Sequence, residues 1–156
     1  LIGVQIGGAL KNVIAIACGV LHGLKLGENA KAAVISRGLT EIIRVAETLG
    51  GKKQTLMGLS GLGDLILTCN SIQSRNFSLG KSIASGKKIQ KYLSSKQSVA
   101  EGAFTAEAAF NLAEKHNLKL PIIEAVHSLL EEKASLKKII FELVNRPIKY
   151  ENDWEN

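Results

Sequence analysis

The amino-acid sequence predicts an all-α protein, and three observations support this. Apolar residues recur at three- and four-residue spacing in long stretches, as on the buried face of a helix. Sustained two-residue alternation, which would predict strands, is absent from the sequence. Only two prolines, Pro121 and Pro147, interrupt the chain. Its 156 residues are enough for one domain with a hydrophobic core.

The first two expected helices are long. Val4–Leu21 is apolar on every face, which is typical of a helix at the centre of a bundle. Gly7 and Gly8 lie inside it and weaken it relative to alanine, which is tolerable where another backbone or a ligand comes close. The second helix covers Glu28–Leu49, and a Gly-Gly pair ends it.

The second half of the chain predicts shorter helices. We expect them at Asn76–Ser85, Ile89–Ser95, Thr105–Asn117, Pro121–Glu132 and Ser135–Asn145. Thr105 and Ser135 are suited to cap two of them, and Pro121 suits a first helical turn. Residues 58–64 are rich in turn-forming glycine, and Val99–Gly102 resembles a connector.

The formal net charge of +6 arises from one segment. Residues 65–100 contain no Asp or Glu, but they contain Arg75, Lys81, Lys87, Lys88, Lys91 and Lys96. Such a run has three interpretations: it forms a solvated helix face, its positive field attracts phosphorylated ligands, or it binds nucleic acid. Only Phe77 and Tyr92 could stack on bases there, and no nucleic-acid-binding motif is present, so we expect no nucleic-acid partner.

Cysteine and histidine usage argues against a metal site or a disulfide framework. Cys18 and Cys69 are too few and too isolated for either, and the three histidines show no ligand spacing. Free cysteines in apolar surroundings suit a reducing cytoplasmic compartment. The uncharged run after Lys11 is too short to span a bilayer, so we also expect no membrane insertion.

Lys11 is the most informative residue. From Ile6 to Leu21, the only side chains that carry a charge or an amide are those of Lys11 and Asn12. Burial disfavours the ammonium form of a lysine, and such a lysine can exchange protons near neutral pH. Lys11 is therefore a candidate acid/base. In the alternative interpretation, Lys11 reaches water at the helix edge and Asn12 is a satisfied core amide.

Two further clusters could complete a site. Asp64 and Thr68 share a helix face; Asp64 either caps that helix or pairs with a buried ammonium group. Ser74, Arg75 and Asn76 open a helix, where free N–H groups and a guanidinium fork suit a phosphate. The alternative there is a surface arginine beside a helix cap. Together these residues suit proton transfer on a small phosphorylated hydroxy compound.

These motifs, in this order, resemble the C-terminal domain of bacterial NAD(P)-dependent glycerol-3-phosphate dehydrogenases. The resemblance rests on Gly8–Val13, Gly61–Leu65 with Thr68–Cys69, Ser74–Asn76 and Val99–Gly102, and it runs from about Gly3 to about Pro147. It implies an all-helical bundle of the 6-phosphogluconate dehydrogenase C-terminal-domain type over residues 1–148. A polar tail, residues 149–156, would follow.

The resemblance also implies an activity. The family interconverts sn-glycerol 3-phosphate and dihydroxyacetone phosphate with NAD or NADP, which supplies glycerol 3-phosphate for phospholipid synthesis. Lys11 would accept and return the proton, and Asn12, Asp64 and Thr68 would line the substrate site. The substrate phosphate would be held by Ser74, Arg75 and Asn76. The nicotinamide nucleotide would be touched by Arg75, Val99 and Glu101.

The dinucleotide-binding half is expected outside this chain. Gly58, Gly61 and Gly63 lack the spacing of a dinucleotide loop, and Met57 is the only methionine. We therefore expect this chain to be a piece of a longer protein, without its N-terminal dinucleotide-binding domain and inactive by itself. The family implies a homodimer. The alternatives are a related hydroxy-acid dehydrogenase domain and a basic helical nucleic-acid-binding module.

Overall fold

Helices are the only regular secondary structure in the described part of the protein, as predicted. A computed structural model describes residues 1–95 and 100–145, and no strand occurs within these ranges. The elements are α1 (Ile2–Gly23), α2 (Glu28–Thr48), α3 (Lys53–Leu56), the π-helix η1 (Leu59–Gly63), α4 (Asp64–Asn70), α5 (Arg75–Ala84), α6 (Ile89–Ser95), α7 (Ala100–His116), α8 (Pro121–Leu130) and α9 (Leu136–Val144).

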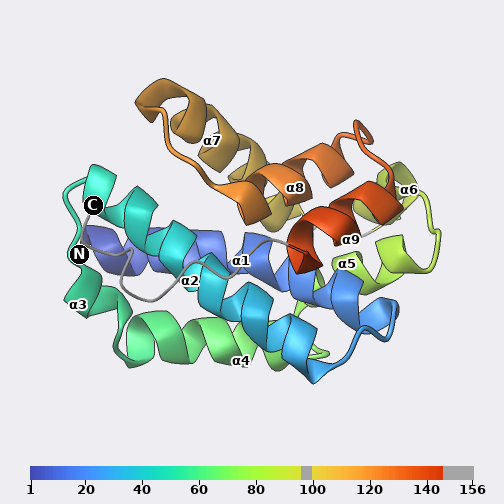
Figure 1. Ribbon diagram of the computed structural model, residues 1–156, viewed down its shortest axis with the longest axis horizontal. Helices are drawn as coiled ribbons and strands as arrows, with labels where there is room; N and C mark the ends of the chain where they lie inside the picture. The colour runs from blue at the N-terminus through green and yellow to red at the C-terminus, as the bar shows by residue number, and fades with distance from the viewer. Residues whose placement is uncertain (96–99, 146–156) are drawn as a thin grey trace.

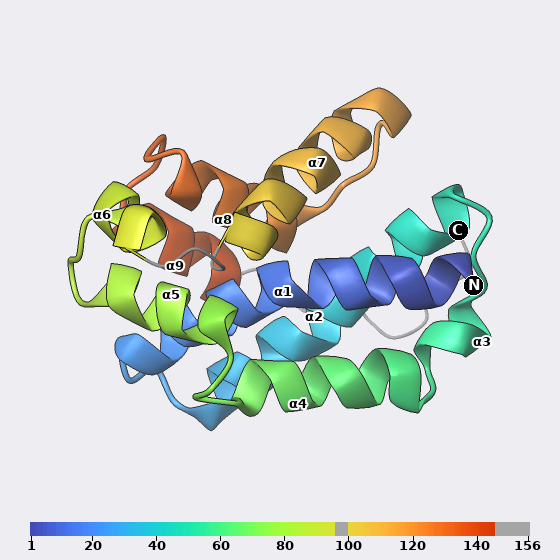
Figure 2. The same ribbon diagram turned by 180° about the vertical axis from the view of Figure 1, so that it is seen from behind.

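Helix α1 lies at the centre of the bundle, as its uniform apolarity predicts. It contacts α2, α4, α5, α7 and α8, and every residue from Val13 to Leu21 is buried. In both views of the molecule α7 and α8 lie above α1 and α4 lies below it (Figure 1, Figure 2). By length and composition α1 could cross a membrane, but 61% of its most apolar window is buried inside the protein. A core helix therefore accounts for this apolarity.

Helices α5 and α1 pack in direct backbone contact. A Cβ atom at Gly19 would overlap the carbonyl oxygen of Phe77, and a Cβ at Gly23 would lie 3.1 Å from the carbonyl oxygen of Lys81. Both pairs advance along the two helices in the same direction, so α5 runs parallel to α1. This register places Arg75, the first residue of α5, level with Ala17 in the second half of α1.

The glycine-rich segment before α4 is a π-helix rather than a simple turn. Residues Leu59–Gly63 form η1, which leads directly into α4. Gly61 is pressed against the backbone of Leu56, where a Cβ atom would overlap the Leu56 carbonyl oxygen. Gly61 is thus needed for close packing, a role that the sequence pattern does not distinguish from turning.

Two expectations for α7 are wrong. Ala100–Gly102 belongs to the helix instead of a connector, and Thr105 lies inside α7 rather than at its cap. Gly102 is buried, and a Cβ atom there would overlap the Oδ1 atom of Asn76. The helix therefore begins earlier than the local sequence predicts, in a segment that packs against α5. Val99, Pro147 and the tail 149–156 lie outside the described residues.

The helix starts predicted at Ser135 and Pro121 are confirmed. Ser135 Oγ accepts a hydrogen bond from the backbone N–H of Lys138 at 3.3 Å. Pro121 is the first residue of α8.

A residue that the sequence analysis did not single out holds α2 against α8. The buried carboxylate of Glu41 accepts hydrogen bonds from the backbone N–H groups of Ile122, at 2.7 Å, and Ile123, at 3.1 Å. These donors belong to the first turn of α8, whose own N-terminal residue offers no side-chain cap. Burial raises the pKa of Glu41 from 4.5 to about 7, although the two N–H donors oppose this shift.

Candidate functional site

Lys11 and Asp64 form an ion pair between α1 and α4. The Lys11 Nζ atom donates to the Asp64 Oδ2 atom at 2.5 Å, although the residues are 53 apart in the chain. The lysine side chain is 22% exposed and the aspartate side chain 35% exposed, so the pair is reached by water. The pairing expected from the sequence is confirmed, and Lys11 has a defined partner at the surface of the core helix.

The capping alternative for Asp64 is wrong. Asp64 is the first residue of α4, Gly63 is its N-cap, and no side chain caps this helix start. Thr68 lies one turn later, and its Oγ1 atom donates to the Asp64 backbone carbonyl oxygen at 2.8 Å. Thr68 therefore shares the face of Asp64, as predicted, and its hydroxyl bonds the Asp64 backbone.

The surroundings of Lys11 on α1 are open on one side. Asn12 is half-buried beside it. A Cβ atom at Gly8, one turn before Lys11, would meet no other atom within 4 Å. At Gly7, by contrast, a Cβ atom would lie 2.9 Å from the Leu56 side chain. Gly7 thus permits close packing, whereas Gly8 leaves free space next to the Lys11 face.

The Ser74–Asn76 motif opens α5, as expected. Ser74 caps the helix, since its Oγ atom accepts from the backbone N–H of Phe77 at 3.3 Å. Arg75 is exposed, whereas Asn76 is buried. The parallel register of α5 and α1 places Arg75 about six residues, or about 9 Å, beyond Lys11 along the axis of α1.

Asn76 carries a buried acceptor that lacks a donor. Among the described residues, no group donates to its Oδ1 atom. A buried polar atom without a partner is unfavourable by about 1–3 kcal/mol, so such atoms often mark a place where a ligand supplies the missing bond. Glu101 is exposed in the first turn of α7, next to Gly102, which packs on Asn76.

Cys18 and Cys69 are not isolated from one another, contrary to the sequence expectation. Both are buried and free, and the Cys18 thiol lies near enough to Cys69 to affect its pKa. The neighbouring Cys18 thiol and burial raise the pKa of the Cys69 thiol. A thiol that is protonated and buried is chemically inert, so the pair belongs to the core that holds α4 on α1. Spacing in the sequence could not reveal this contact.

No cluster of three or more His, Cys, Asp or Glu side chains is placed to hold a metal ion in the part of the chain that the structure describes. The groups available for binding are therefore one ammonium–carboxylate pair, amides, hydroxyls and a guanidinium group.

Comparison with known proteins shows the family of this chain. Residues 1–141 match the family model for the C-terminus of NAD-dependent glycerol-3-phosphate dehydrogenase. The chain belongs to this family. A glycerol-3-phosphate dehydrogenase [NAD(P)+] from Novosphingobium aromaticivorans is 51% identical over 150 residues, which cover 96% of this chain and 45% of that protein. The protein of the same name from Rhodospirillum rubrum is 48% identical over 155 residues, which cover 99% of this chain and 44% of that protein.

Solved structures show the same fold. The glycerol-3-phosphate dehydrogenase of Coxiella burnetii superposes with a TM-score of 0.88 at 42% identity, covering 94% of this chain and 45% of that one. The yeast Saccharomyces cerevisiae glycerol-3-phosphate dehydrogenase gives a TM-score of 0.82 at 30% identity, covering 94% and 43%. The chain thus spans less than half the length of these members of the glycerol-3-phosphate dehydrogenase family.

Proposed function

We propose that this chain is the substrate-binding and catalytic half of an NAD(P)-dependent glycerol-3-phosphate dehydrogenase. The reaction would interconvert sn-glycerol 3-phosphate and dihydroxyacetone phosphate, and it would supply glycerol 3-phosphate for phospholipid synthesis. The ion pair between Lys11 Nζ and Asp64 Oδ2, at the water-accessible edge of an otherwise apolar helix, carries this proposal.

Lys11 acts as the acid/base in this proposal. Reduction of a ketone needs a proton at the carbonyl oxygen, and the Lys11 ammonium group donates it. In the reverse direction the neutral amine accepts the proton of the alcohol. Asp64 holds the Nζ atom in position. Because Lys11 is 22% exposed, its proton exchanges with water between turnovers.

The start of α5 anchors the phosphate. Arg75 supplies a guanidinium fork, and the first turn of this ten-residue helix supplies backbone N–H groups. The anchor lies about 9 Å beyond Lys11 along α1, a span that the long Arg75 side chain and a phosphorylated three-carbon substrate can bridge together. Asn12 and Thr68 complete the wall around the reacting carbon.

The nicotinamide cofactor fits the same region. NAD or NADP supplies the hydride acceptor or donor when it is bound, and its main cradle lies in the N-terminal half that the relatives carry. The orphaned Asn76 Oδ1 atom of this chain fits a ligand that offers an N–H or O–H donor. Arg75 and Glu101 are exposed beside it, and Val99 is proposed to join them.

The test is steady-state turnover of this chain fused behind the N-terminal half of the Novosphingobium aromaticivorans relative, here called the fusion enzyme. With dihydroxyacetone phosphate and NADH or NADPH, we expect Lys11→Ala to lower kcat by roughly 10²- to 10⁴-fold. Lys137→Ala, which removes an exposed lysine from α9, should leave kcat unchanged. Turnover that survives in Lys11→Ala would refute the role of Lys11. Turnover of a non-phosphorylated 2-hydroxy acid instead would favour a related dehydrogenase.

We also propose that the protein is cytoplasmic and forms a homodimer. The free, buried thiols of Cys18 and Cys69 support a reducing compartment. Light scattering of the fusion enzyme should report twice the mass of one chain. A monomer at micromolar concentration would contradict the dimer.

A further inference from the structure

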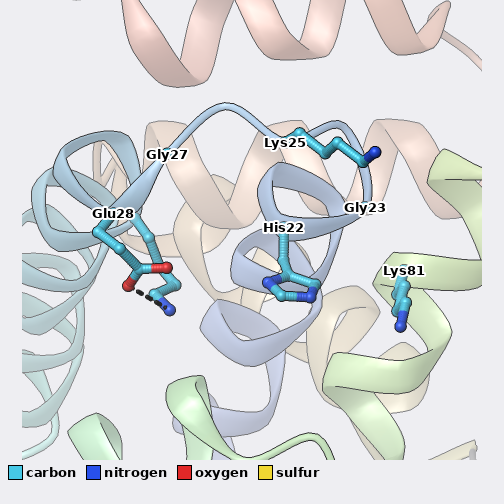
Figure 3. Close-up of a pocket in the computed structure, with 7 residues that line it drawn as sticks. His22, Gly23, Lys25, Gly27, Glu28 and Lys81 are labelled. Atoms are coloured by element: carbon cyan, nitrogen blue, oxygen red, sulfur yellow. Dashed lines mark ion pairs between the residues drawn. The ribbon is translucent and has the colours of Figure 1, made fainter.

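We propose that a second anion site, separate from the one that holds Lys11, lies at the turn between α1 and α2 and binds a phosphate group. A pocket of about 440 Å³ is present there (Figure 3). Its wall includes His22 from α1, Lys25 and Glu28 from the turn and the start of α2, Lys31 from α2, and Lys81 from α5. Three lysines thus face one carboxylate. This volume lies in the range of small-molecule pockets.

The cations come from three separate elements and surround the same space. Figure 3 shows His22 between Glu28 on one side and Lys81 on the other, with Lys25 on the connecting turn. Lys31 Nζ lies 2.7 Å from Glu28 Oε2, so that pair nearly cancels in charge. Lys25 and Lys81 have no carboxylate partner within 4.0 Å among the described residues. The pocket therefore retains a positive field that favours an anion.

Backbone geometry adds donors to this pocket. Gly27 is the N-cap of the 21-residue helix α2, and no side chain caps that helix start. The first N–H groups of α2 thus remain available for an anion, and the helix dipole favours negative charge there. Gly23 lines the same pocket, and a Cβ atom at this position would lie 2.6 Å from the Ala84 Cβ atom. The lack of a side chain brings α5, and with it Lys81, close to the turn.

The pocket is distinct from the Lys11 site. His22 lies eleven positions after Lys11 on α1, which corresponds to about 16 Å along the helix axis. The ligand chemistry is a phosphate dianion, because two unpaired lysines match two negative charges. It could arrive as a free phosphate compound or as the headgroup of an anionic lipid.

The test is a titration of the ¹⁵N-labelled protein with inorganic phosphate and with pyrophosphate, followed by amide chemical shifts. Gly23, Gly27 and Glu28 report the proposed pocket, whereas Arg75 and Asn76 report the start of α5. We expect saturable shifts at the first group that weaken at high salt. Shifts confined to Arg75 and Asn76 would overturn this proposal while leaving the proposed function intact.

A double variant, Lys25→Asn with Lys81→Gln, removes the two unpaired charges. Asparagine tolerates the left-handed backbone of residue 25, whose φ is 56°, and Lys81 is exposed, so folding should be preserved. We expect phosphate affinity at the pocket to fall roughly tenfold or more. The matched variant Lys137→Gln should leave it unchanged. An equal loss of phosphate affinity in Lys137→Gln would mean that phosphate is attracted nonspecifically to surface lysines, and it would refute the proposed site.

A second arm separates the two sources of phosphate. The protein is sedimented with vesicles of phosphatidylcholine alone or with added phosphatidylglycerol. Binding to the anionic vesicles that the double variant loses identifies a lipid headgroup as ligand. Saturable binding of phosphate or pyrophosphate without vesicle binding identifies a free phosphate compound. Absence of both kinds of binding refutes the proposal.

Discussion

The Nζ atom of Lys11 lies 2.5 Å from the Oδ2 atom of Asp64, and this contact joins the core helix α1 to the first residue of α4. Both side chains are partly exposed, and ion pairs of this kind add little to stability, about 0–1 kcal/mol. Its larger effect is on position: it fixes the lysine nitrogen at one place on the edge of an apolar helix. This is the property that a proton donor needs.

The first prediction concerns the positioning effect of Asp64. Asp64→Asn in the fusion enzyme removes the counter-charge, so Lys11 loses its fixed position. We expect kcat to fall roughly 10²-fold, since a displacement of about 1 Å in a reacting group has an effect of that order. The free energy of unfolding should change by less than about 1 kcal/mol. The matched variant Glu28→Gln, which breaks the ion pair with Lys31, should keep full kcat. An unchanged kcat in Asp64→Asn would contradict the assignment.

The second prediction concerns Arg75 as the phosphate anchor. Arg75→Lys keeps the positive charge but removes the planar fork that binds two phosphate oxygens. We expect the KM for dihydroxyacetone phosphate to rise roughly tenfold, which corresponds to about 1.4 kcal/mol of binding free energy. Because Arg75 is exposed, the stability should not change. Arg44→Lys, on α2, makes the same chemical change elsewhere and should leave KM as it is. Equal KM values for all three enzymes would exclude Arg75 from phosphate binding.

The third prediction separates two glycines of α1. A Cβ atom at Gly8 would meet nothing within 4 Å, so Gly8→Ala should raise the free energy of unfolding by up to about 1 kcal/mol through helix propensity. It should lower kcat/KM in the fusion enzyme if substrate occupies the space beside Lys11. At Gly19 a Cβ atom would overlap the Phe77 carbonyl oxygen, so Gly19→Ala should destabilise the protein by several kcal/mol. Urea unfolding measures both changes. Destabilisation by Gly8→Ala would show that this space is filled.

The fourth prediction concerns pH and Glu41. Its pKa is about 7 in the folded protein and 4.5 in the reference state, so the folded state holds this proton more tightly. The stabilisation from protonation is fully present below pH 4.5 and is lost as pH rises through 7. The shift corresponds to at most about 3 kcal/mol. Urea unfolding between pH 5 and 8 should show stability falling with pH in the native protein. Glu41→Gln should flatten this trend; the same slope in both proteins would refute it.

Much of the helical architecture could be predicted from local sequence. The helix starts predicted at Glu28 and Pro121 agree with the observed starts of α2 and α8. The uniform apolarity of α1 predicted its central place, because a helix without a polar face is stable only where protein surrounds it. Lys11 was identifiable as a candidate because nothing in the neighbouring sequence accounts for a charged side chain in so apolar a helix.

The partners of these residues were decided by tertiary structure. Three pairings join segments distant in the chain: Lys11 with Asp64, the neighbouring thiols of Cys18 and Cys69, and the Glu41 carboxylate with the α8 backbone. Helical periodicity shows which face a residue occupies, but not which element packs there.

The early start of α7 and the π-helical turn at Gly61 likewise depend on close backbone packing. The sequence by itself thus determined the helices, the resemblance and the candidate lysine. Only the packing of the helices decided which groups surround that lysine, since those distances depend on contacts between segments that local propensity does not encode.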